Sequence, residues 1–326
     1  MLRTATIGVG SLGRHHARNS KTLASEGKCE FAAVCDVNEK TAQSLAEEYK
    51  CEWTTDWRSL IGRVDAVSLS TPTESHSEIG CALLEAGIHV LVEKPIARTL
   101  EEADMMIESA KKSGAMLMVG HLERFNPALV ALRPHVTKPL YFEIHRVGQF
   151  TARSLDIDVV LDVMIHDLDI VQWLVGEDVE VTEVHAVGIP VLTQKVDAAN
   201  VRLEFANGAV ANITASRIGM EKIRKMRFYQ SRDYVAVDYI THYAALSGLG
   251  APQAGSPFPS VNIRRLEVNP IEPLRLEIES FINSIENKTP APIPGEDGRR
   301  ALSLAIRTLD KIHEHAKIAG VPSGAS

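Results

Sequence analysis

Three glycines near the start of the chain have the spacing of a phosphate-binding turn. They belong to the hexapeptide Gly8-Val9-Gly10-Ser11-Leu12-Gly13, which follows a short apolar run and precedes an amphipathic stretch. Between a strand and a helix, the first glycine makes the turn, the second lets the backbone approach a pyrophosphate, and the third allows close packing. The unpaired N–H groups of the helix N-terminus then face the phosphates. We therefore predict that Gly8, Gly10, Ser11, Leu12 and Gly13 bind a dinucleotide cofactor.

An acidic residue after the second apolar run bears on the choice of cofactor. Asp36 lies 23 residues after Gly13, where a carboxylate accepts hydrogen bonds from the adenosine ribose. The same charge repels a 2′-phosphate, so the sequence predicts a preference for NAD over NADP. Arg14 could pair with that phosphate and leaves NADP open. The structural alternative for Asp36 is a turn residue at the end of a strand.

A lysine and a histidine–carboxylate pair could perform acid–base chemistry. Lys94 follows a later apolar run, and an ammonium group at the carboxyl end of a parallel strand can stabilise a developing oxyanion. Asp162 and His166 are four residues apart, so they share one face of a predicted helix, which Asp169 continues. A carboxylate beside an imidazole fixes its tautomer and suits a general base. The structural alternatives are an exposed loop lysine and a surface Asp–His pair.

Strands and helices alternate through the region that carries the glycine-rich turn. Short apolar runs predict strands at residues 5–9, 31–35, 66–69, 89–92 and 116–119. Amphipathic stretches predict helices at 12–24, 39–49, 75–86 and 100–112, the last with Thr99 as its N-cap. This alternation is typical of βαβ units and predicts a doubly wound parallel sheet of the Rossmann type. We expect this dinucleotide-binding domain to cover residues 1–122.

The remaining residues, 123–326, show a different pattern. Strands are predicted at 141–147, 179–187, 198–205, 209–215 and 234–239, and Asn207-Gly208 is a strong hairpin signal. One helix, 158–174, interrupts them, and helices at 274–287 and 296–318 close the chain. The Gly- and Pro-rich residues 248–259 predict a loop. Consecutive strands predict a large, mainly antiparallel sheet, in a domain for catalysis, substrate binding and oligomerisation.

Composition excludes several classes of function. The 326 residues carry a net charge of −7 and a pI near 6.0, so no basic footprint for nucleic acid is present. No apolar run approaches the roughly 18 residues of a membrane span, and the N-terminus does not resemble a signal peptide. The cysteines (Cys29, Cys35, Cys51 and Cys81) and the twelve histidines form no metal-binding motif. We expect a cytoplasmic protein that uses no metal and binds neither nucleic acid nor membrane.

Longer motifs point to a known family. Ser70-Thr71-Pro72 with His76, Glu93-Lys94-Pro95, the Asp162/His166 pair and the closing segment 295–302 together resemble the glucose–fructose oxidoreductase/inositol dehydrogenase (Gfo/Idh/MocA) family. The resemblance implies an NAD(P)-dependent dehydrogenase acting on CH–OH groups. It implies that Thr71, Pro72, His76, Glu93 and Lys94 help to bind the cofactor. It also implies that His166 takes the hydroxyl proton, that Lys94 holds the oxygen, and that Asp162 holds His166.

Three further segments indicate the substrate. Residues 120–127, 143–146 and 164–169, with Arg153, are similar to the branch that includes UDP-N-acetylglucosamine 3-dehydrogenases. That resemblance implies a UDP-sugar, whose pyrophosphate suits arginine. The basic run Lys222, Arg224, Lys225 and Arg227 adds positive charge to an acidic protein. The predicted substrate-binding residues are His121, Arg124, Asn126, Arg146, Arg153 and Asp169.

Other functions stay open at this stage. A dehydrogenase of a free polyol or simple sugar would need no phosphate-binding arginines. A non-catalytic nicotinamide-sensing regulator would be expected to lose the lysine or the histidine, and this chain keeps both. A hydrolase using transient oxidation would show no net redox change. We expect a homodimer or homotetramer, with the sheet of the second domain as the contact surface.

Overall fold

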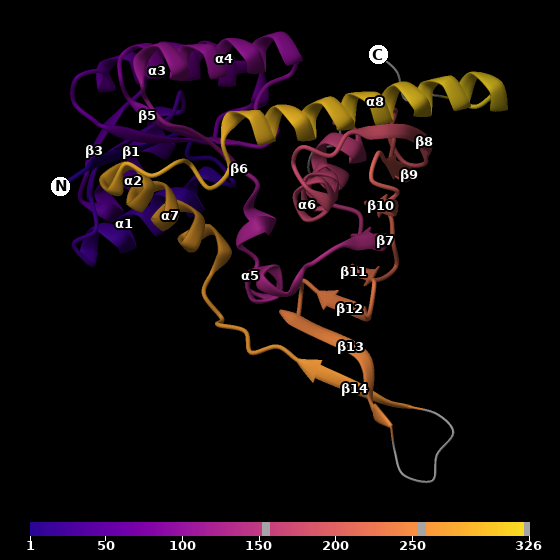
Figure 1. Cartoon of the computed structure of the whole chain (residues 1–326). Coiled ribbons are helices and arrows are strands. Elements are labelled where there is room, and N and C mark those ends of the chain that lie inside the picture. Colours follow the sequence, from indigo (N-terminus) through magenta and orange to yellow (C-terminus); the bar gives the residue numbers. More distant parts are fainter. Residues whose placement is uncertain (152–156, 253–258, 323–326) are drawn as a thin grey trace. The chain divides into compact units, whose positions relative to one another are not determined.

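The computed structural model describes residues 1–151, 157–252 and 259–322 (Figure 1). Contacts divide the chain into two compact units. The first unit contains residues 1–125 and 271–302, and the second contains residues 126–270 and 303–326. The first unit therefore consists of two stretches of sequence, separated by residues 126–270. The predicted division into domains 1–122 and 123–326 stays a prediction.

The first unit is built on a six-stranded parallel sheet. Its strand order is β3-β2-β1-β4-β5-β6, which reverses direction between β1 and β4, as in dinucleotide-binding folds. The Rossmann-type prediction is thereby confirmed. The strands are β1 (Arg3–Ile7), β2 (Glu30–Cys35), β3 (Glu52–Thr54), β4 (Ala66–Leu69), β5 (His89–Glu93) and β6 (Leu117–Gly120). Only the short edge strand β3 was not predicted.

Helices cover both faces of this sheet. Figure 1 shows α3 and α4 on one face and α1, α2 and α7 on the other. Thr99 caps α4 as predicted, because its side chain accepts a hydrogen bond from the Glu102 N–H. The bounds are α1 (Gly13–Ser25), α2 (Glu39–Tyr49), α3 (His76–Glu85), α4 (Leu100–Ser113), α7 (Pro273–Asn287) and α8 (Gly295–Ala319), with short helices η1 (Trp57–Leu60), η2 (Thr73–Ser75) and η3 (Leu122–Phe125).

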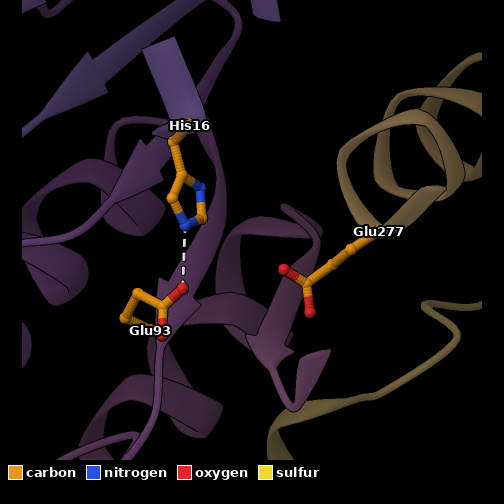
Figure 2. Close-up of side chains that lie close together, drawn as sticks. All are labelled: His16, Glu93 and Glu277. Atoms are coloured by element: carbon orange, nitrogen blue, oxygen red, sulfur yellow. Dashed lines mark hydrogen bonds and ion pairs between the residues drawn. The ribbon is translucent and has the colours of Figure 1, made fainter. Parts of the chain in front are cut away.

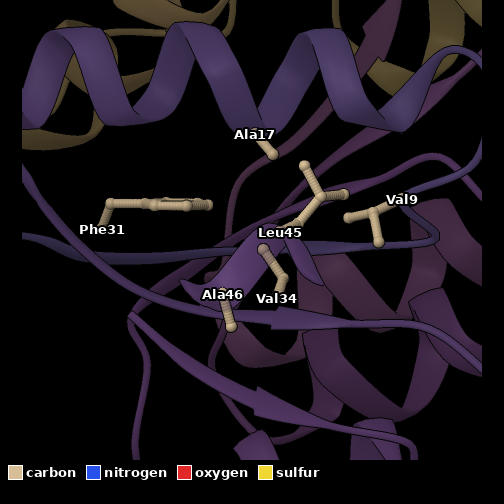
Figure 3. Packing of buried hydrophobic residues seen from close by; sticks show 6 residues of the cluster. All are labelled: Val9, Ala17, Phe31, Val34, Leu45 and Ala46. Atoms are coloured by element: carbon tan, nitrogen blue, oxygen red, sulfur yellow. The ribbon is translucent and has the colours of Figure 1, made fainter. Parts of the chain in front are cut away.

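A small apolar cluster fixes α1 and α2 on the sheet. It consists of Val9, Ala17, Phe31, Val34, Leu45 and Ala46, all buried (Figure 3). Alanines on the two helices let their backbones approach the strands, and the larger residues fill the space between. This packing holds the N-terminus of α1 at the carboxyl end of β1, where the glycine-rich turn lies.

The second unit is built on an eight-stranded sheet in the order β14-β13-β12-β11-β7-β10-β9-β8. Only β7 and β10 pair in parallel, and the other neighbours are antiparallel, so the predicted mainly antiparallel sheet is confirmed. The strands are β7 (Pro139–Val147), β8 (Val181–Ile189), β9 (Ala198–Phe205), β10 (Val210–Ser216), β11 (Ile223–Gln230), β12 (Asp233–Asp238), β13 (Tyr243–Pro252) and β14 (Pro259–Arg265).

Part of this sheet differs from the prediction. Strand β11, which was not predicted, contains Arg224, Lys225 and Arg227 of the basic run, and these three residues are exposed, whereas its Met226 and Phe228 are fully buried. The loop predicted at 248–259 is wrong for residues 248–252 and 259, because β13 continues to Pro252 and β14 begins at Pro259. Residues 253–258 lie outside the described part of the chain. Main-chain pairing with β14 overrides the weak strand preference of the glycines there.

The helices of the second unit are α5 (Pro127–Leu132), η4 (Arg133–His135), η5 (Val160–Met164), α6 (Ile165–Val175) and the later part of α8. A single helix was expected at 158–174. Instead, η5 is a π-helical segment that leads directly into α6, and the Ile165 N–H donates to the Val160 carbonyl five residues earlier. π-Helical turns are frequent at functional sites. This one contains Asp162.

All four cysteines are free thiols. Burial, helped by the charges of Asp36 and Asp56, raises the pKa of the Cys35 thiol to about 12. Within the described residues, no helix has both the length and the apolarity to cross a membrane.

Candidate cofactor and catalytic sites

The glycine-rich turn has the geometry that its sequence predicts. Gly8 has a φ of +79°, and a Cβ there would lie 2.7 Å from the Thr71 backbone nitrogen. A Cβ on Gly13 would overlap the carbonyl oxygen of Gly8. By contrast, a Cβ on Gly10 would meet nothing within 4 Å. Gly8 and Gly13 thus allow backbone segments to pack closely against each other. The open space beside Gly10 leaves room for the pyrophosphate of a cofactor.

Asp36 is partly exposed at the carboxyl end of β2, beside this turn. Its Oδ2 accepts a hydrogen bond of 2.8 Å from the Val9 N–H, and its Oδ1 accepts one of 2.8 Å from the Asn38 N–H. The carboxylate therefore helps to shape the turn, and it lies where a ribose hydroxyl is expected. A surface cavity of about 540 Å³ between α1 and α2, close in sequence to this site, is lined in part by Arg14 and Lys40.

A buried histidine ties together two loops at the carboxyl ends of β4 and β5. His76 Nε2 lies 2.9 Å from the Thr71 carbonyl oxygen, and Nδ1 lies 3.1 Å from that of Pro95. Burial lowers the pKa of His76, although the two carbonyls oppose this shift. Thr71 also accepts a hydrogen bond from the Ser75 hydroxyl, while Pro72 is exposed. The predicted cofactor residues of both loops thus lie at one edge of the sheet.

Lys94 follows the last residue of β5 and is only partly buried. The peptide bond between Lys94 and Pro95 is cis. The Lys94 N–H donates a hydrogen bond of 3.2 Å to Oε2 of Glu93, whose Oε1 lies 2.8 Å from Nε2 of His16. The side chain of Glu93 therefore holds the backbone N–H of Lys94 in place.

The predicted general base lies on the second unit. Asp162 belongs to η5, and His166 is the second residue of α6; both are partly buried. Asp169, on the same helix, is 2% exposed. The roles of Lys94, Asp162 and His166 stay a prediction, which the position of Asp162 in a π-helical turn supports.

The two predicted substrate arginines in the described residues are each bonded to a buried carboxylate. Arg146, 3% exposed, donates from Nε and Nη2 to the two oxygens of Asp167 at 2.7 and 2.8 Å, and its guanidinium lies 5.1 Å from the Tyr239 ring centre. Arg124, 6% exposed, donates to Asp297 at 2.7 Å. Both side chains therefore have a structural role, and their contact with substrate stays a prediction.

The other predicted substrate residues have different surroundings. His121 is 1% exposed after β6. Asn126 accepts from the Ala128 N–H as the N-cap of α5 and donates to the Tyr239 carbonyl. Arg153 lies outside the described residues.

Sequence reasoning missed one buried acid. Glu277 on α7 is fully buried and lies near His16 and Glu93 (Figure 2). Its place in an apolar stripe with Leu274, Ile278 and Phe281 is the signal that could have revealed it.

The Rossmann sheet and the open glycine turn at the end of β1 together define a dinucleotide-binding fold. The family described as "Oxidoreductase family, NAD-binding Rossmann fold" matches residues 2–121, and the "GFO/IDH/MocA C-terminal domain" matches residues 131–232. The chain belongs to this GFO/IDH/MocA family. It is an oxidoreductase of the sugar-dehydrogenase type that uses NAD(H).

Named relatives cover nearly the whole chain. UDP-N-acetylglucosamine 3-dehydrogenase of Acidithiobacillus ferrooxidans is 37% identical, over 94% of this chain and 96% of the relative. A solved structure of that enzyme aligns with a TM-score of 0.89, at 36% identity, over 95% of this chain and 97% of that one. Myo-inositol 2-dehydrogenase of Thermotoga maritima is 28% identical, over 97% of this chain and 98% of the relative.

Proposed function

We propose that the protein oxidises the C3 hydroxyl of a UDP-N-acetylhexosamine, UDP-N-acetylglucosamine in the first instance, with NAD as the hydride acceptor. The observation that carries this proposal is the 37% identity to UDP-N-acetylglucosamine 3-dehydrogenase over nearly the full length of both chains. The inositol dehydrogenase is equally well covered but only 28% identical. Since fold does not fix the substrate, the sugar has to be tested directly.

The glycine-rich turn and Asp36 would hold NAD, which would supply the hydride acceptor for the sugar carbon. His166 accepts the hydroxyl proton, and Asp162 holds the imidazole in the tautomer that can accept it. The Lys94 ammonium stabilises the oxygen as negative charge develops on it. The products are a 3-keto sugar and NADH, and the proton ends on His166 before it leaves to solvent.

Cofactor choice follows from Asp36. Its carboxylate accepts two backbone hydrogen bonds and lies partly exposed, so a 2′-phosphate placed beside it would be repelled. We therefore expect NAD to bind more tightly than NADP. Arg14 and Lys40, which line the neighbouring surface cavity, are the groups that could weaken this preference.

We further propose that the protein is a cytoplasmic homodimer or homotetramer and that the sheet of the second unit forms the contact between copies. One face of its sheet carries a row of tyrosines: the rings of Tyr141 and Tyr229 stack at 5.9 Å, and those of Tyr229 and Tyr234 lie 5.2 Å apart. Tyr229 is 44% exposed. Tyrosine is enriched at interfaces, and Tyr229→Glu should shift the mass measured by light scattering toward the monomer.

The deciding experiment incubates the protein with NAD and UDP-N-acetylglucosamine, coupled to an aminotransferase that removes the ketone. The coupling is needed because alcohol oxidation has an unfavourable equilibrium. Lys94→Ala and His166→Ala should each lower kcat by at least about 100-fold with little change in NAD affinity, and Asp162→Asn should cost less than His166→Ala. A silent coupled assay, together with ready NADH formation from inositol or a hexose, would establish the free-polyol dehydrogenase instead.

A further inference from the structure

Three ionisable side chains meet in the interior of the first unit. His16 of α1 is 1% exposed, Glu93 at the end of β5 is 8% exposed, and Glu277 of α7 is 0% exposed. One nitrogen or oxygen atom from each lies within 4.8 Å of the others. Figure 2 shows the Glu277 carboxyl directed from α7 toward the other two side chains. We call these residues the buried triad.

Hydrogen bonds in the triad are unevenly shared. Glu93 uses both oxygens, one with Nε2 of His16 and the other with the Lys94 N–H. Neither carboxyl oxygen of Glu277 has a hydrogen-bond partner among the described residues, and the same is true of Nδ1 of His16. A buried ionised carboxylate without partners is very costly, so Glu277 needs a proton or a cation.

The charges indicate a proton. Burial raises the pKa of Glu277 well above its usual value, and the negative charge of Glu93 adds to the effect. Burial also pushes the pKa of Glu93 upward, but the hydrogen bond and charge of His16, with Lys94, outweigh it and hold this pKa below its usual value. The triad therefore contains one carboxylate, Glu93, and one neutral acid, Glu277.

A metal ion fits these atoms less well. Nε2 of His16 and Oε1 of Glu93 are already joined by a hydrogen bond of 2.8 Å. A cation bonded to both atoms would have to replace that proton. All three side chains are also enclosed, and a metal site needs an entry path.

The triad connects directly to the reactive lysine. Glu93 is the residue before Lys94 and accepts its N–H. Gly120 pairs with Glu93 across β5 and β6, and a Cβ on Gly120 would lie 3.2 Å from Oε1 of Glu93. The Glu93 carboxyl therefore has little space to move. If it did move, the hydrogen bond from the Lys94 N–H would shift the Lys94 backbone with it.

We propose that Glu277, as a neutral acid, is a positioning residue for Lys94 and acts through Glu93 and His16. A polar, uncharged neighbour lets Glu93 stay ionised and hydrogen-bonded, whereas a second negative charge would compete with it for His16. The inference rests on the proposed function in one respect, the reactive role of Lys94.

Helix α7 packs against α1, η3 and β5. The charged or titratable groups on these elements are Arg14, His15, His16, Arg18 and Lys21 of α1, His89 and Glu93 of β5, and Glu123 and Arg124 of η3, of which Arg124 is bonded to Asp297. On α7 itself, Arg275 and Glu279 are engaged with Glu26 and Lys28. Glu93 and His16 each have an atom within 4.8 Å of a Glu277 carboxyl oxygen.

The test uses four substitutions in the full chain: Glu277→Gln, Glu277→Leu, Gly120→Ala and, as a matched control, Glu286→Gln at an exposed position on α7. The first readout is kcat in the coupled assay, beside NAD affinity. The second needs no substrate: the rate at which acetic anhydride acetylates Lys94, followed against pH by peptide mass spectrometry. This second readout reports the environment of the lysine directly.

Glu277→Gln keeps a neutral polar group, so we expect kcat within about threefold of wild type and an unchanged acetylation profile. Glu277→Leu removes the polar neighbour and raises the cost of the Glu93 charge. It should lower kcat at least about tenfold, with unchanged NAD affinity and a shifted midpoint of Lys94 acetylation. Gly120→Ala, which crowds Glu93 while leaving Glu277 intact, should change both readouts in the same direction.

Several results would overturn the inference. Wild-type kcat and acetylation in Glu277→Leu would leave Glu277 with a purely structural role. An equal loss of kcat in Glu277→Gln and Glu277→Leu, or a stoichiometric metal ion in the purified protein, would show that Glu277 acts as an ionised carboxylate and not as a neutral acid. If Glu277→Leu does not fold, a loss of kcat greater than about threefold in Glu277→Gln, or wild-type readouts in Gly120→Ala, would still overturn the inference. Full activity in Lys94→Ala would instead refute the proposed role of the lysine, and the acetylation profiles would still test its link to Glu277.

Discussion

Replacing Arg146 by alanine tests whether this arginine serves folding or substrate binding. Its partner Asp167 is 0% exposed and accepts both hydrogen bonds from the guanidinium group. Breaking a buried ion pair on one side leaves an uncompensated charge and costs about 3–5 kcal/mol. In a chain of this size the melting temperature should fall on the order of 10 °C. Urea and thermal unfolding measure both quantities.

A double variant separates the two roles. Arg146→Met with Asp167→Leu replaces the pair by apolar side chains, which is often neutral or stabilising, so most of the lost stability should return. If the arginine also contacts a substrate phosphate, this stable double variant should still lose roughly 10–150-fold in kcat/KM for UDP-N-acetylglucosamine. A stability change below about 1 kcal/mol in Arg146→Ala would refute the reasoning from the buried pair.

Three further outcomes are expected. Asp36→Ala should lower the ratio of the NADP dissociation constant to the NAD dissociation constant at least about tenfold. Asp36→Asn keeps an oxygen that can accept the backbone hydrogen bonds of the glycine-rich turn, so it controls for distortion of that turn. Tighter binding of NADP than of NAD by the wild-type protein would contradict the role assigned to Asp36. Because Glu277 keeps its proton in the folded protein, wild-type stability should decrease as pH rises from its ordinary pKa of 4.5 toward the raised folded pKa. Chemical unfolding at several pH values should show that Glu277→Gln lacks this decrease. With its thiol pKa raised to about 12, Cys35 should be alkylated at pH 8 at least about 100-fold more slowly than the partly exposed Cys81; equal rates in the folded protein would contradict its burial.

Most of the first unit could be predicted because each strand and helix has a strong local pattern. Helix α2 (Glu39–Tyr49) and strand β4 (Ala66–Leu69) have their predicted bounds. Strand β3 was missed because it has three residues, none of them buried, and depends on pairing with β2. Local sequence does not encode such pairing.

Prediction was weaker in the second unit, where tertiary pairing decides the structure. In β11 the charged residues Arg224, Lys225 and Arg227 mask the alternation that buries Met226 and Phe228. The π-helical turn at Val160–Met164 could not be foreseen, since its sequence suits an ordinary α-helix. The spacing of Asp162 and His166 identified the candidate residues but not the backbone that presents them.

In the candidate site, too, local patterns could be predicted from the sequence and tertiary contacts could not. The turn residues Gly8, Gly10 and Gly13 were found by spacing, because each glycine has a separate steric reason. The pairing of Arg146 with Asp167 was not foreseen, because an arginine on a strand and an aspartate on a helix give no local sign that they will meet. Glu277 was overlooked although a charged residue in an apolar stripe is unusual.

The division of the first unit into residues 1–125 and 271–302 has a consequence for its synthesis. Helix α7 supplies buried Leu274, Ile278 and Phe281 and packs against α1, near the other end of the chain. At roughly 5–20 residues per second, translation of the intervening segment takes on the order of 10 s. During that interval the nascent Rossmann sheet has emerged without the helix that covers α1, and its apolar surface is open to chaperones and to other nascent chains. Residues 1–125 of the coenzyme-binding unit are therefore synthesised before residues 126–270, but the fold of that unit is completed only after residues 271–302 have followed.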